Sequence, residues 1–284
     1  MSVVLSPRTG SAATYLDPVR MIRNLWRHRE LIRQLTTQEV AQRYRGSFLG
    51  IVWSFVTPML MLLVYAFVFS VVFQVRWGEA TQSSQRGEFA LLLFAGLIPF
   101  GVFTEVVNRA PSIVLSAPNY VKKVVFPLEI LPVAALGSAI VHSLISAAIL
   151  LVAGLPLLGY VSPAAVLLPV AYLPLVLLTV GLGWFLASLG VYVRDIGQVI
   201  GVATQILLFL SPIFYPVSAV PEAFRLVLHV NPLTPILTDF RRTLLWGAVP
   251  AWETWTIVTL GSAVVTVLGY AWFMQTKKGF ADVM

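Results

Sequence analysis

The sequence predicts an all-α membrane protein with six transmembrane helices, an N-terminal amphipathic interface helix and a re-entrant outer helical hairpin between spans five and six. Hydrophobic residues make up 58% of the 284 positions and charged residues only 11%, whereas soluble domains carry about 25% charged residues. The mean hydropathy is +0.86. Six apolar stretches approach the ~20 residues that a spanning helix needs: 48–73, 89–107, 130–158, 163–190, 198–217 and 253–274. We therefore expect one transmembrane domain over 1–284, with its six spans within 48–274.

The segment 17–45 precedes the first span and is predicted to lie in the membrane interface. Asp17 and Pro18 suit the N-cap and the first position of a helix. Arginines cover much of this helix, and an apolar face opposes them. The apolar residues are Ile22, Leu25, Trp26, Ile32 and Leu35. The alternative is a basic segment that only orients the chain. Gly46 then offers a bend into the first span, because glycine adopts backbone angles that other residues avoid.

The distribution of lysine and arginine predicts how the chain crosses the membrane. With six spans, the side that holds both termini carries 14 of the 19 lysines and arginines, and the other side carries 5. Positive residues favour the cytoplasm, so both termini, including a tail at 275–284, are expected there. The net charge of +7 is concentrated in these connecting segments. It indicates contact with anionic membrane lipids rather than with nucleic acid.

The segment 218–250 is too polar and proline-rich for a further span and too apolar for an ordinary loop. Two short helices, near 221–229 and 234–246, are expected to enter the outer leaflet and return. Non-helical backbone at membrane depth needs cover from protein or water. The hairpin is therefore predicted to line or gate the outer mouth of a pathway. An amphipathic hairpin that rests on the membrane surface is the alternative.

No motif for catalysis or cofactor binding occurs in the sequence. The phosphate-binding pattern G-x-x-x-x-G-K-[ST], the zinc motif H-E-x-x-H and the nucleophile motif G-x-S-x-G are missing, and there is no cysteine. We expect a chain that binds no cofactor or metal and catalyses no reaction. A membrane enzyme for lipid-linked sugars is the alternative, but its candidate acids, Glu222 and Asp239, do not have the spacing of a catalytic pair. His142 in span three is expected to form a hydrogen bond between helices.

Two groups of aromatic residues lie in the outer halves of spans one and five. They are Tyr65, Phe69 and Phe73 in the first and Phe209, Phe214 and Tyr215 in the second. The first three recur every four residues and so share one helix face. Sugars stack their C–H faces on aromatic rings, and apolar chains pack against them, so we predict a conduit for a glycan or a lipid. For any ring taken singly, an interfacial belt or ordinary helix packing is the alternative.

Five stretches of the chain resemble the permease subunits of bacterial type 2 ABC transporters that export polysaccharide, such as O-antigen, capsule or teichoic acid. They are "QRYRGSFLGIVWSFVTPML", "APNYVKKVVFPLEILP", "YVRDIGQVIGVATQILLFLSPIFYP", "NPLTPILTDFRRTLLWG" and "KKGFADVM". They follow one another in the family's order over nearly the whole chain. Each motif alone is loose, but together they are specific for the family, though not for the exported polymer.

The resemblance implies a transport subunit of the bacterial inner membrane that pairs with a second copy of itself and with two ATP-binding cassette subunits. Those partners, and not this chain, would bind ATP and Mg²⁺. The substrate would be a polyprenyl-diphosphate-linked glycan, first of all lipopolysaccharide O-antigen. Capsule, teichoic acid, a drug or a small lipid are the alternatives. Spans one and five would line the conduit.

The resemblance also implies two cytoplasmic turns that couple the chain to the ATPase. Their residues are Asn119, Tyr120, Lys122, Lys123, Arg194 and Asp195. Arg43 and Arg45, at the inner mouth, are predicted to recruit the lipid diphosphate, because guanidinium groups bind phosphate oxygens in pairs. Ordinary anchoring of span one by positive charge is the alternative for these two arginines.

Overall fold

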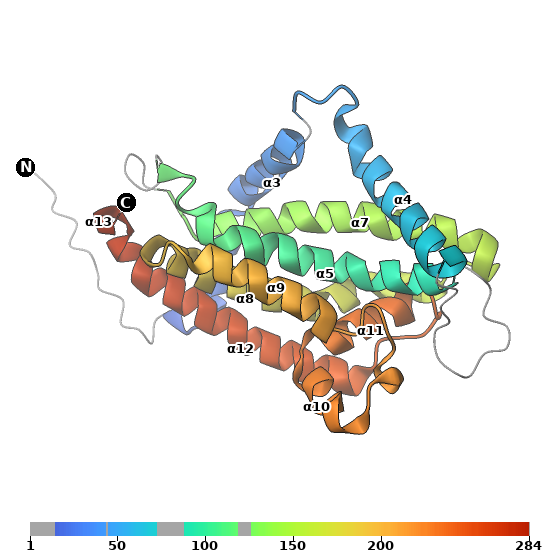
Figure 1. Ribbon diagram of the computed structural model, residues 1–284. Helices are drawn as coiled ribbons and strands as arrows, with labels where there is room; N and C mark the ends of the chain where they lie inside the picture. Colours follow the sequence, from blue (N-terminus) through green and yellow to red (C-terminus); the bar gives the residue numbers. More distant parts are fainter. Residues whose placement is uncertain (1–14, 44, 73–87, 119–125, 284) are drawn as a thin grey trace, which may run out of the picture.

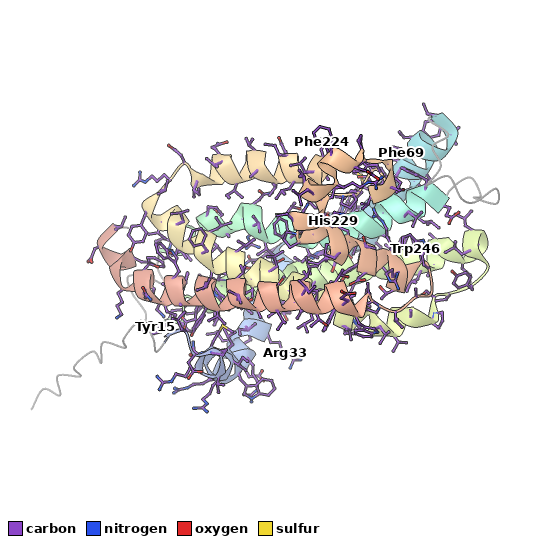
Figure 2. All side chains as sticks on the ribbon, turned by 90° about the horizontal axis from the view of Figure 1, so that it is seen from below. Tyr15, Arg33, Phe69, Phe224, His229 and Trp246 are labelled. Atoms are coloured by element: carbon purple, nitrogen blue, oxygen red, sulfur yellow. The ribbon has the colours of Figure 1, made fainter. Side chains whose placement is uncertain are left out.

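The computed structural model describes residues 15–43, 45–72, 88–118 and 126–283, and every regular element in these ranges is a helix. Figure 1 shows the long helices running along a common axis, with α4 crossing them obliquely. These helices are α4 (Trp53–Tyr65), α5 (Glu88–Ile113), α7 (Ile130–Leu158), α8 (Leu168–Tyr192), α9 (Ile196–Leu210) and α12 (Trp252–Thr276). Tyr15 (Figure 2) and the C-terminal helix α13 (Phe280–Val283; Figure 1) lie at one end of the bundle, called here the basic end. The opposite end is called the far end.

Five helical segments of the described chain are long and apolar enough to cross a membrane. They are Gly50–Phe69, Glu88–Ile113, Ile130–Leu158, Pro163–Tyr192 and Trp252–Val283. The predicted fifth span, 198–217, corresponds to α9, which has 15 residues and ends at Leu210. Such a helix is ~22 Å long, less than the ~30 Å apolar core of a bilayer. The six-span prediction is therefore not confirmed by helix lengths.

Proline explains the early end of α9. Ser211 is extended, with φ −105° and ψ 145°, because the residue before a proline avoids helical angles and Pro212 follows it. The helix stops although the sequence stays apolar up to Pro216. A hydropathy window over 198–217 therefore merges a helix with a non-helical segment.

Helix α5 lies at the centre of the bundle beside α8, and α12 packs along α8. Over the most apolar part of α5, 78% of the residues are buried. Small residues allow close approach: a Cβ added at Gly269 of α12 would collide with the backbone of Gly181 of α8, and one added at Gly190 would collide with the backbone of Pro111. These contacts bring α8 close to the end of α5 at Pro111 and to α12 at Gly269.

The N-terminal segment forms two helices, α2 (Pro18–Arg27) and α3 (Arg29–Arg43), with a break at His28. The predicted cap is confirmed: the Asp17 carboxylate accepts hydrogen bonds from the backbone N–H groups of Val19 (2.9 Å) and Arg20 (3.4 Å). The predicted apolar face divides. Leu25 and Leu35 pack against the core, while Ile22 and Trp26 are exposed.

The bend predicted between 17–45 and the first span is confirmed at Gly46, whose φ is +82°. Gly50, with φ +50°, begins a short 3₁₀ helix, η1 (Gly50–Val52), which leads into α4. A π-helical stretch, η2 (Ala66–Val72), continues α4. Within α4 only Ser54 and Leu62 are buried. Most of the apolar surface of α4 is therefore uncovered in a single chain.

The remaining helices include the two expected within 218–250. They are α10 (Glu222–Val230) and α11 (Leu233–Leu244), after η4 (Val217–Ala219); η3 (Pro163–Leu167), η5 (Lys277–Gly279) and α13 (Phe280–Val283) complete the described elements. Helix α11 packs into the bundle beside α5 and α8 and is largely buried. Helix α10 buries only Leu228.

Candidate functional site

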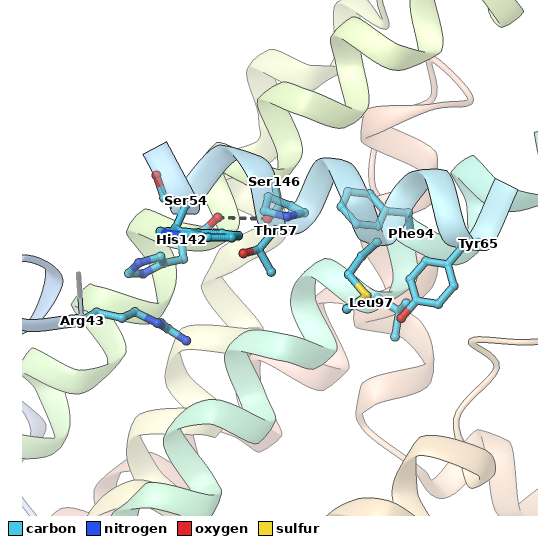
Figure 3. A pocket seen from close by; sticks show the side chains of 11 residues that line it. Arg43, Ser54, Thr57, Tyr65, Phe94, Leu97, His142 and Ser146 are labelled. Atoms are coloured by element: carbon cyan, nitrogen blue, oxygen red, sulfur yellow. Dashed lines mark hydrogen bonds between the residues drawn. The ribbon is translucent and has the colours of Figure 1, made fainter. Parts of the chain in front are cut away.

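A cleft of about 330 Å³ runs between α4, α5 and α7. Its lining mixes aromatic and polar side chains. Figure 3 shows Arg43 toward one end of the cleft and Tyr65 with Phe94 toward the other, with Thr57 and His142 between them. The groups that face the cleft offer hydroxyl, imidazole and guanidinium hydrogen bonds next to ring faces.

A second cleft of about 170 Å³ adjoins the first and shares Phe94, Leu97, His142 and Ser146 with it. It extends the first cleft to Glu105 on α5. The Arg43 guanidinium lies 2.8 Å from the Glu105 carboxylate, so the two charges meet where the clefts join. We call the two clefts together the α4 groove.

Three of the aromatic residues predicted from spans one and five lie together at the far end, namely Phe69, Phe209 and Phe214. The Phe69 ring lies 5.2 Å from the Phe89 ring and 6.3 Å from the Phe214 ring. Phe214 in turn stacks on Phe209 at 5.8 Å, and the Tyr215 hydroxyl donates to the Phe209 carbonyl. Figure 2 places Phe69 in the half of the molecule opposite Tyr15. Tyr65 belongs to the α4 groove instead, one turn before Phe69.

The groove and the rings together form a line along α4. From the basic end it passes from Arg43 and Glu105 to His142, then to Tyr65, and ends at Phe69. Polar groups therefore occupy the first part of the line and aromatic rings the last part. This order suits a ligand that is drawn in by charge and then moves over ring faces.

Several predicted site residues lie outside the described residues: Phe73, Asn119, Tyr120, Lys122 and Lys123. Arg45 is exposed in the turn after α3. Arg194 and Asp195 are exposed between α8 and α9. The Tyr192 hydroxyl, just before them, donates to the Thr276 carbonyl (2.8 Å) and its ring contacts Phe280. This turn therefore lies at the basic end, beside the C-terminal helix.

A buried polar cluster at the basic end was not predicted. Glu129 is 3% exposed, and its carboxylate accepts hydrogen bonds from Lys277 (2.6 Å) and Asn24 (2.9 Å). Asn24 also donates to the Tyr270 hydroxyl. Burial raises the pKa of Glu129, but the Lys277 charge and the hydrogen bonds outweigh it, so the pKa lies below its usual value. We call these four residues the Glu129 cluster; they join α2 to α12 and to the start of α7.

A buried arginine at the far end was also missed. Arg241 of α11 is 2% exposed. Its guanidinium donates to the carbonyls of Leu92 (2.9 Å), Pro212 (2.7 Å) and Ile213 (3.1 Å). The last two carbonyls belong to the non-helical segment after α9. Arg241 therefore donates hydrogen bonds to two backbone carbonyls that lie beyond the end of α9.

Nothing among the described residues assembles a metal site, since no group of three His, Cys, Asp or Glu side chains occurs there. The acids considered for an enzyme do not pair. Asp239 is buried and accepts from the Ala251 N–H, while Glu222 is exposed and lies 3.7 Å from Arg225. His142 Nδ1 lies 2.8 Å from the Ser138 carbonyl oxygen within α7. One turn away, a hydrogen bond between α7 and α8 joins Ser143 to Tyr172 (2.6 Å).

Known proteins match this chain over most of its length. An O-antigen export system permease protein RfbA from Myxococcus xanthus is 27% identical over 266 residues, covering 93% of this chain and 99% of the relative. One of the same name from Klebsiella pneumoniae is 24% identical, covering 90% and 95%. The polysialic acid transport protein KpsM of Escherichia coli is 20% identical, covering 87% and 93%.

The family match agrees with the helices described above. Residues 30–245 match the ABC-2 type transporter family, a range that runs from α3 through α11 and includes the α4 groove, the aromatic rings and Arg241. The matched range is more than half of the 284 residues. The five long apolar helices and this match together show that the chain belongs to the ABC-2 type transporter family of membrane proteins.

Proposed function

We propose that this chain is the membrane-spanning subunit of an ATP-driven exporter that moves a polyprenyl-diphosphate-linked polysaccharide out of the cytoplasm. O-antigen is the leading candidate for this polysaccharide. The observation that supports this proposal is the end-to-end similarity to permeases named for O-antigen export. The more distant similarity to a polysialic acid transporter supports the same class of substrate. Capsule and teichoic acid chains are the next candidates, ahead of a drug or a small lipid.

The line along α4 gives the proposed route. Arg43 would meet the diphosphate at the inner mouth, and the sugar units would pass the hydroxyl and imidazole groups near His142 before reaching the rings at Phe69. Aromatic faces suit this step because they bind sugar rings whatever the order of the sugars in the polymer. The uncovered surfaces of α4 and α9, in which only Ser54, Leu62 and Thr204 are buried, would face a second copy of the chain across the conduit.

The proposed topology has six crossings with both termini in the cytoplasm. Helix α9 and the segment 211–216 would together form the fifth crossing, and Arg241 would cover the carbonyls of its non-helical part. Helices α10 and α11 would form the re-entrant hairpin at the outer mouth. Helix α2 would lie in the inner interface, because Ile22 and Trp26 remain exposed beside its arginines.

Coupling to two ATP-binding subunits would occur at the basic end. Arg194 and Asp195 are exposed there, and the turn that carries them adjoins the end of α5 through the close contact of Gly190 with Pro111. Movement of the turn that carries Arg194 and Asp195 would therefore be transmitted to the coupling turn proposed after α5. The residues proposed for the first coupling turn, 119–123, lie outside the described residues.

Deleting the gene is expected to separate export from synthesis. Cells should keep making the lipid-linked polymer and accumulate it inside, while surface polymer falls below detection. Immunoblots of intact cells against lysates would measure both pools, and a plasmid copy of the gene should restore the surface signal. Accumulation of an unpolymerised or unmodified precursor would instead assign the chain to an enzyme.

Reversing both charges at the inner mouth, in Arg43→Glu/Arg45→Glu, is expected to lower surface polymer at least about tenfold, because the charge-assisted contacts to the diphosphate are replaced by repulsion. The measurement is surface polymer per unit of membrane-embedded protein. Glu105→Gln should leave export intact, since it releases Arg43 from its 2.8 Å ion pair without removing the guanidinium.

Arg23→Glu/Arg27→Glu is the matched control for this double variant. Both residues are exposed on α2, so the change in charge and in topology bias is the same, but the α4 groove is untouched. An equal loss of surface polymer in the two double variants would mean that Arg43 and Arg45 only anchor the first span by positive charge. Normal export by the Arg43/Arg45 variant at normal protein level would remove the recruitment step altogether.

A further inference from the structure

A separate pocket of about 340 Å³ lies between α10, α11 and the first turns of α12. Figure 1 shows α10 and α12 on the side of the bundle away from α4, so this pocket is not part of the α4 groove. Apolar side chains, among them Leu228, Ile257 and Val258, form much of its wall. The export route proposed above leaves this pocket without a role.

Besides the imidazole of His229, the pocket wall carries one carboxylate, that of Asp239. This residue is 2% exposed, and its Oδ1 accepts a hydrogen bond from the Ala251 N–H at 2.9 Å. Within the described chain Asp239 forms no salt bridge, and the charge of Arg242 acts on it without such a contact. A buried carboxylate is costly unless a cation or several hydrogen-bond donors accompany it. The pocket therefore suits a ligand that brings positive charge and N–H donors.

A second polar group supports the same conclusion. Thr234 lines the pocket and is 8% exposed, and its buried hydroxyl oxygen has no hydrogen-bond partner among the described residues. Buried hydroxyl groups are normally paired. Thr238 and Thr254 add hydroxyl groups to the wall, but each already donates to a backbone carbonyl, so their oxygens remain as acceptors.

The pocket sits at the level of a membrane interface. Trp252 and Trp255 begin α12 with rings 5.8 Å apart, and the Trp255 indole donates to the Val170 carbonyl. Tryptophan gathers where apolar chains meet headgroups. Below this level, Ile257, Leu260 and Val264 are 65%, 64% and 59% exposed, which makes a lipid-facing stripe on α12. Ile257 belongs to both the stripe and the pocket wall.

We propose that this pocket binds a phospholipid whose headgroup carries a primary ammonium, with the ammonium on Asp239 and Thr234 and an acyl chain along Ile257. A primary ammonium has three N–H donors, whereas a choline headgroup has none and a glycerol headgroup carries no positive charge. Bound lipid would fix α10 and α11 against α12. The inference does not depend on which substrate is exported, because lipid binding is measured without transport.

The test is native mass spectrometry of the purified full-length protein with three lipids of identical acyl chains. These are phosphatidylethanolamine, phosphatidylcholine and phosphatidylglycerol. We expect wild type to retain the ethanolamine lipid about tenfold more than either of the others, the ratio that one charge-assisted hydrogen bond supplies. Asp239→Asn should abolish the preference, since it keeps the oxygen that accepts from Ala251 and removes the charge.

Glu253→Gln is the matched control, because it removes one exposed carboxylate at the same level of α12 but outside the pocket. It should keep the preference. Thr254→Trp, which fills the pocket and spares Asp239, should lose the ethanolamine lipid even if Asp239→Asn folds poorly. Equal retention of the three lipids, or an undiminished preference in Asp239→Asn, would overturn the proposal. So would Asp239-dependent binding of a polysaccharide fragment without lipid selectivity.

Discussion

An Arg241→Met variant is expected to be at least about 3 kcal/mol less stable than wild type and to accumulate poorly in membranes. The guanidinium satisfies three backbone carbonyls, at Leu92, Pro212 and Ile213. Each buried acceptor left without its donor costs about 1–3 kcal/mol, and methionine replaces none of the three bonds. Thermal unfolding of the detergent-purified protein, with membrane yield measured alongside, tests this expectation. Arg241→Lys should recover little, because an ammonium lacks the planar fork that reaches several carbonyls.

Arg242→Met provides the control, since it removes the same charge from the same helix. Arg242 is half-exposed, and its side chain donates a hydrogen bond to the Val249 carbonyl, so its loss should cost less than about 1 kcal/mol. Gly96→Ala probes the site from α5. A Cβ there would lie 2.6 Å from Arg241 Nη2, and displacing the fork should destabilise the protein without altering Arg241. If Arg241→Met and Arg242→Met unfold at the same temperature, the hydrogen bonds of Arg241 do not stabilise the far end of the bundle.

The parts of the fold that sequence reasoning predicted depend on local signals. The Asp17 cap, the bend at Gly46 and the two short helices within 218–250 follow from residues within a few positions of each feature. Five of the predicted spans correspond to long helices because hydropathy alone specifies them. The N-terminal helix was predicted as one piece, and the break at His28 has no proline or glycine to announce it.

The features that sequence reasoning missed depend on contacts between distant residues. Arg241 meets a carbonyl 149 positions away, and nothing in "FRRTLLWG" distinguishes it from Arg242. The partners of Glu129 come from positions 24 and 277, which are distant from it in the sequence. From the sequence alone, an ionisable residue next to a span can be exposed at the interface or buried with partners, and the packing of distant helices determines which. The general expectation that could have found these residues is that an ionisable side chain is costly to bury in a membrane protein and is therefore paired.

The aromatic prediction shows an intermediate case. Helical spacing placed Tyr65 and Phe69 on one face, but it did not indicate that Tyr65 would line the groove with Phe94 while Phe69 would meet Phe214. Both outcomes follow from the oblique crossing of α4, whose first turns stand away from the other helices and whose last turns meet them at the far end (Figure 1). Crossing geometry depends on which ridges interlock, and a single helix sequence does not specify its neighbour's ridges.

The Glu129 cluster gives the second large effect, which is expected in Lys277→Met. Removing Lys277 leaves a carboxylate that is 4% exposed without its cation, and breaking such a pair costs about 3–5 kcal/mol. The lower end applies, because Lys277 itself is 27% exposed and solvent screens the interaction. Lys278→Met removes the same charge from an exposed neighbour and should be nearly neutral. Glu129→Gln/Lys277→Met should recover part of the loss, since the amide is neutral and still bonds to Asn24.

The pH dependence of this loss distinguishes an unpaired charge from lost packing. In wild type the pKa of Glu129 lies below the ordinary 4.5, so its stabilisation is present above that pH and is lost as the pH falls through the folded-state value. In Lys277→Met, burial without the lysine favours the protonated acid. The difference in melting temperature between wild type and Lys277→Met should therefore shrink as the pH falls from 7 to about 4.5. A constant difference would mean that the lysine acts through its methylene chain, and the ion pair would then not be what joins α2 to α12.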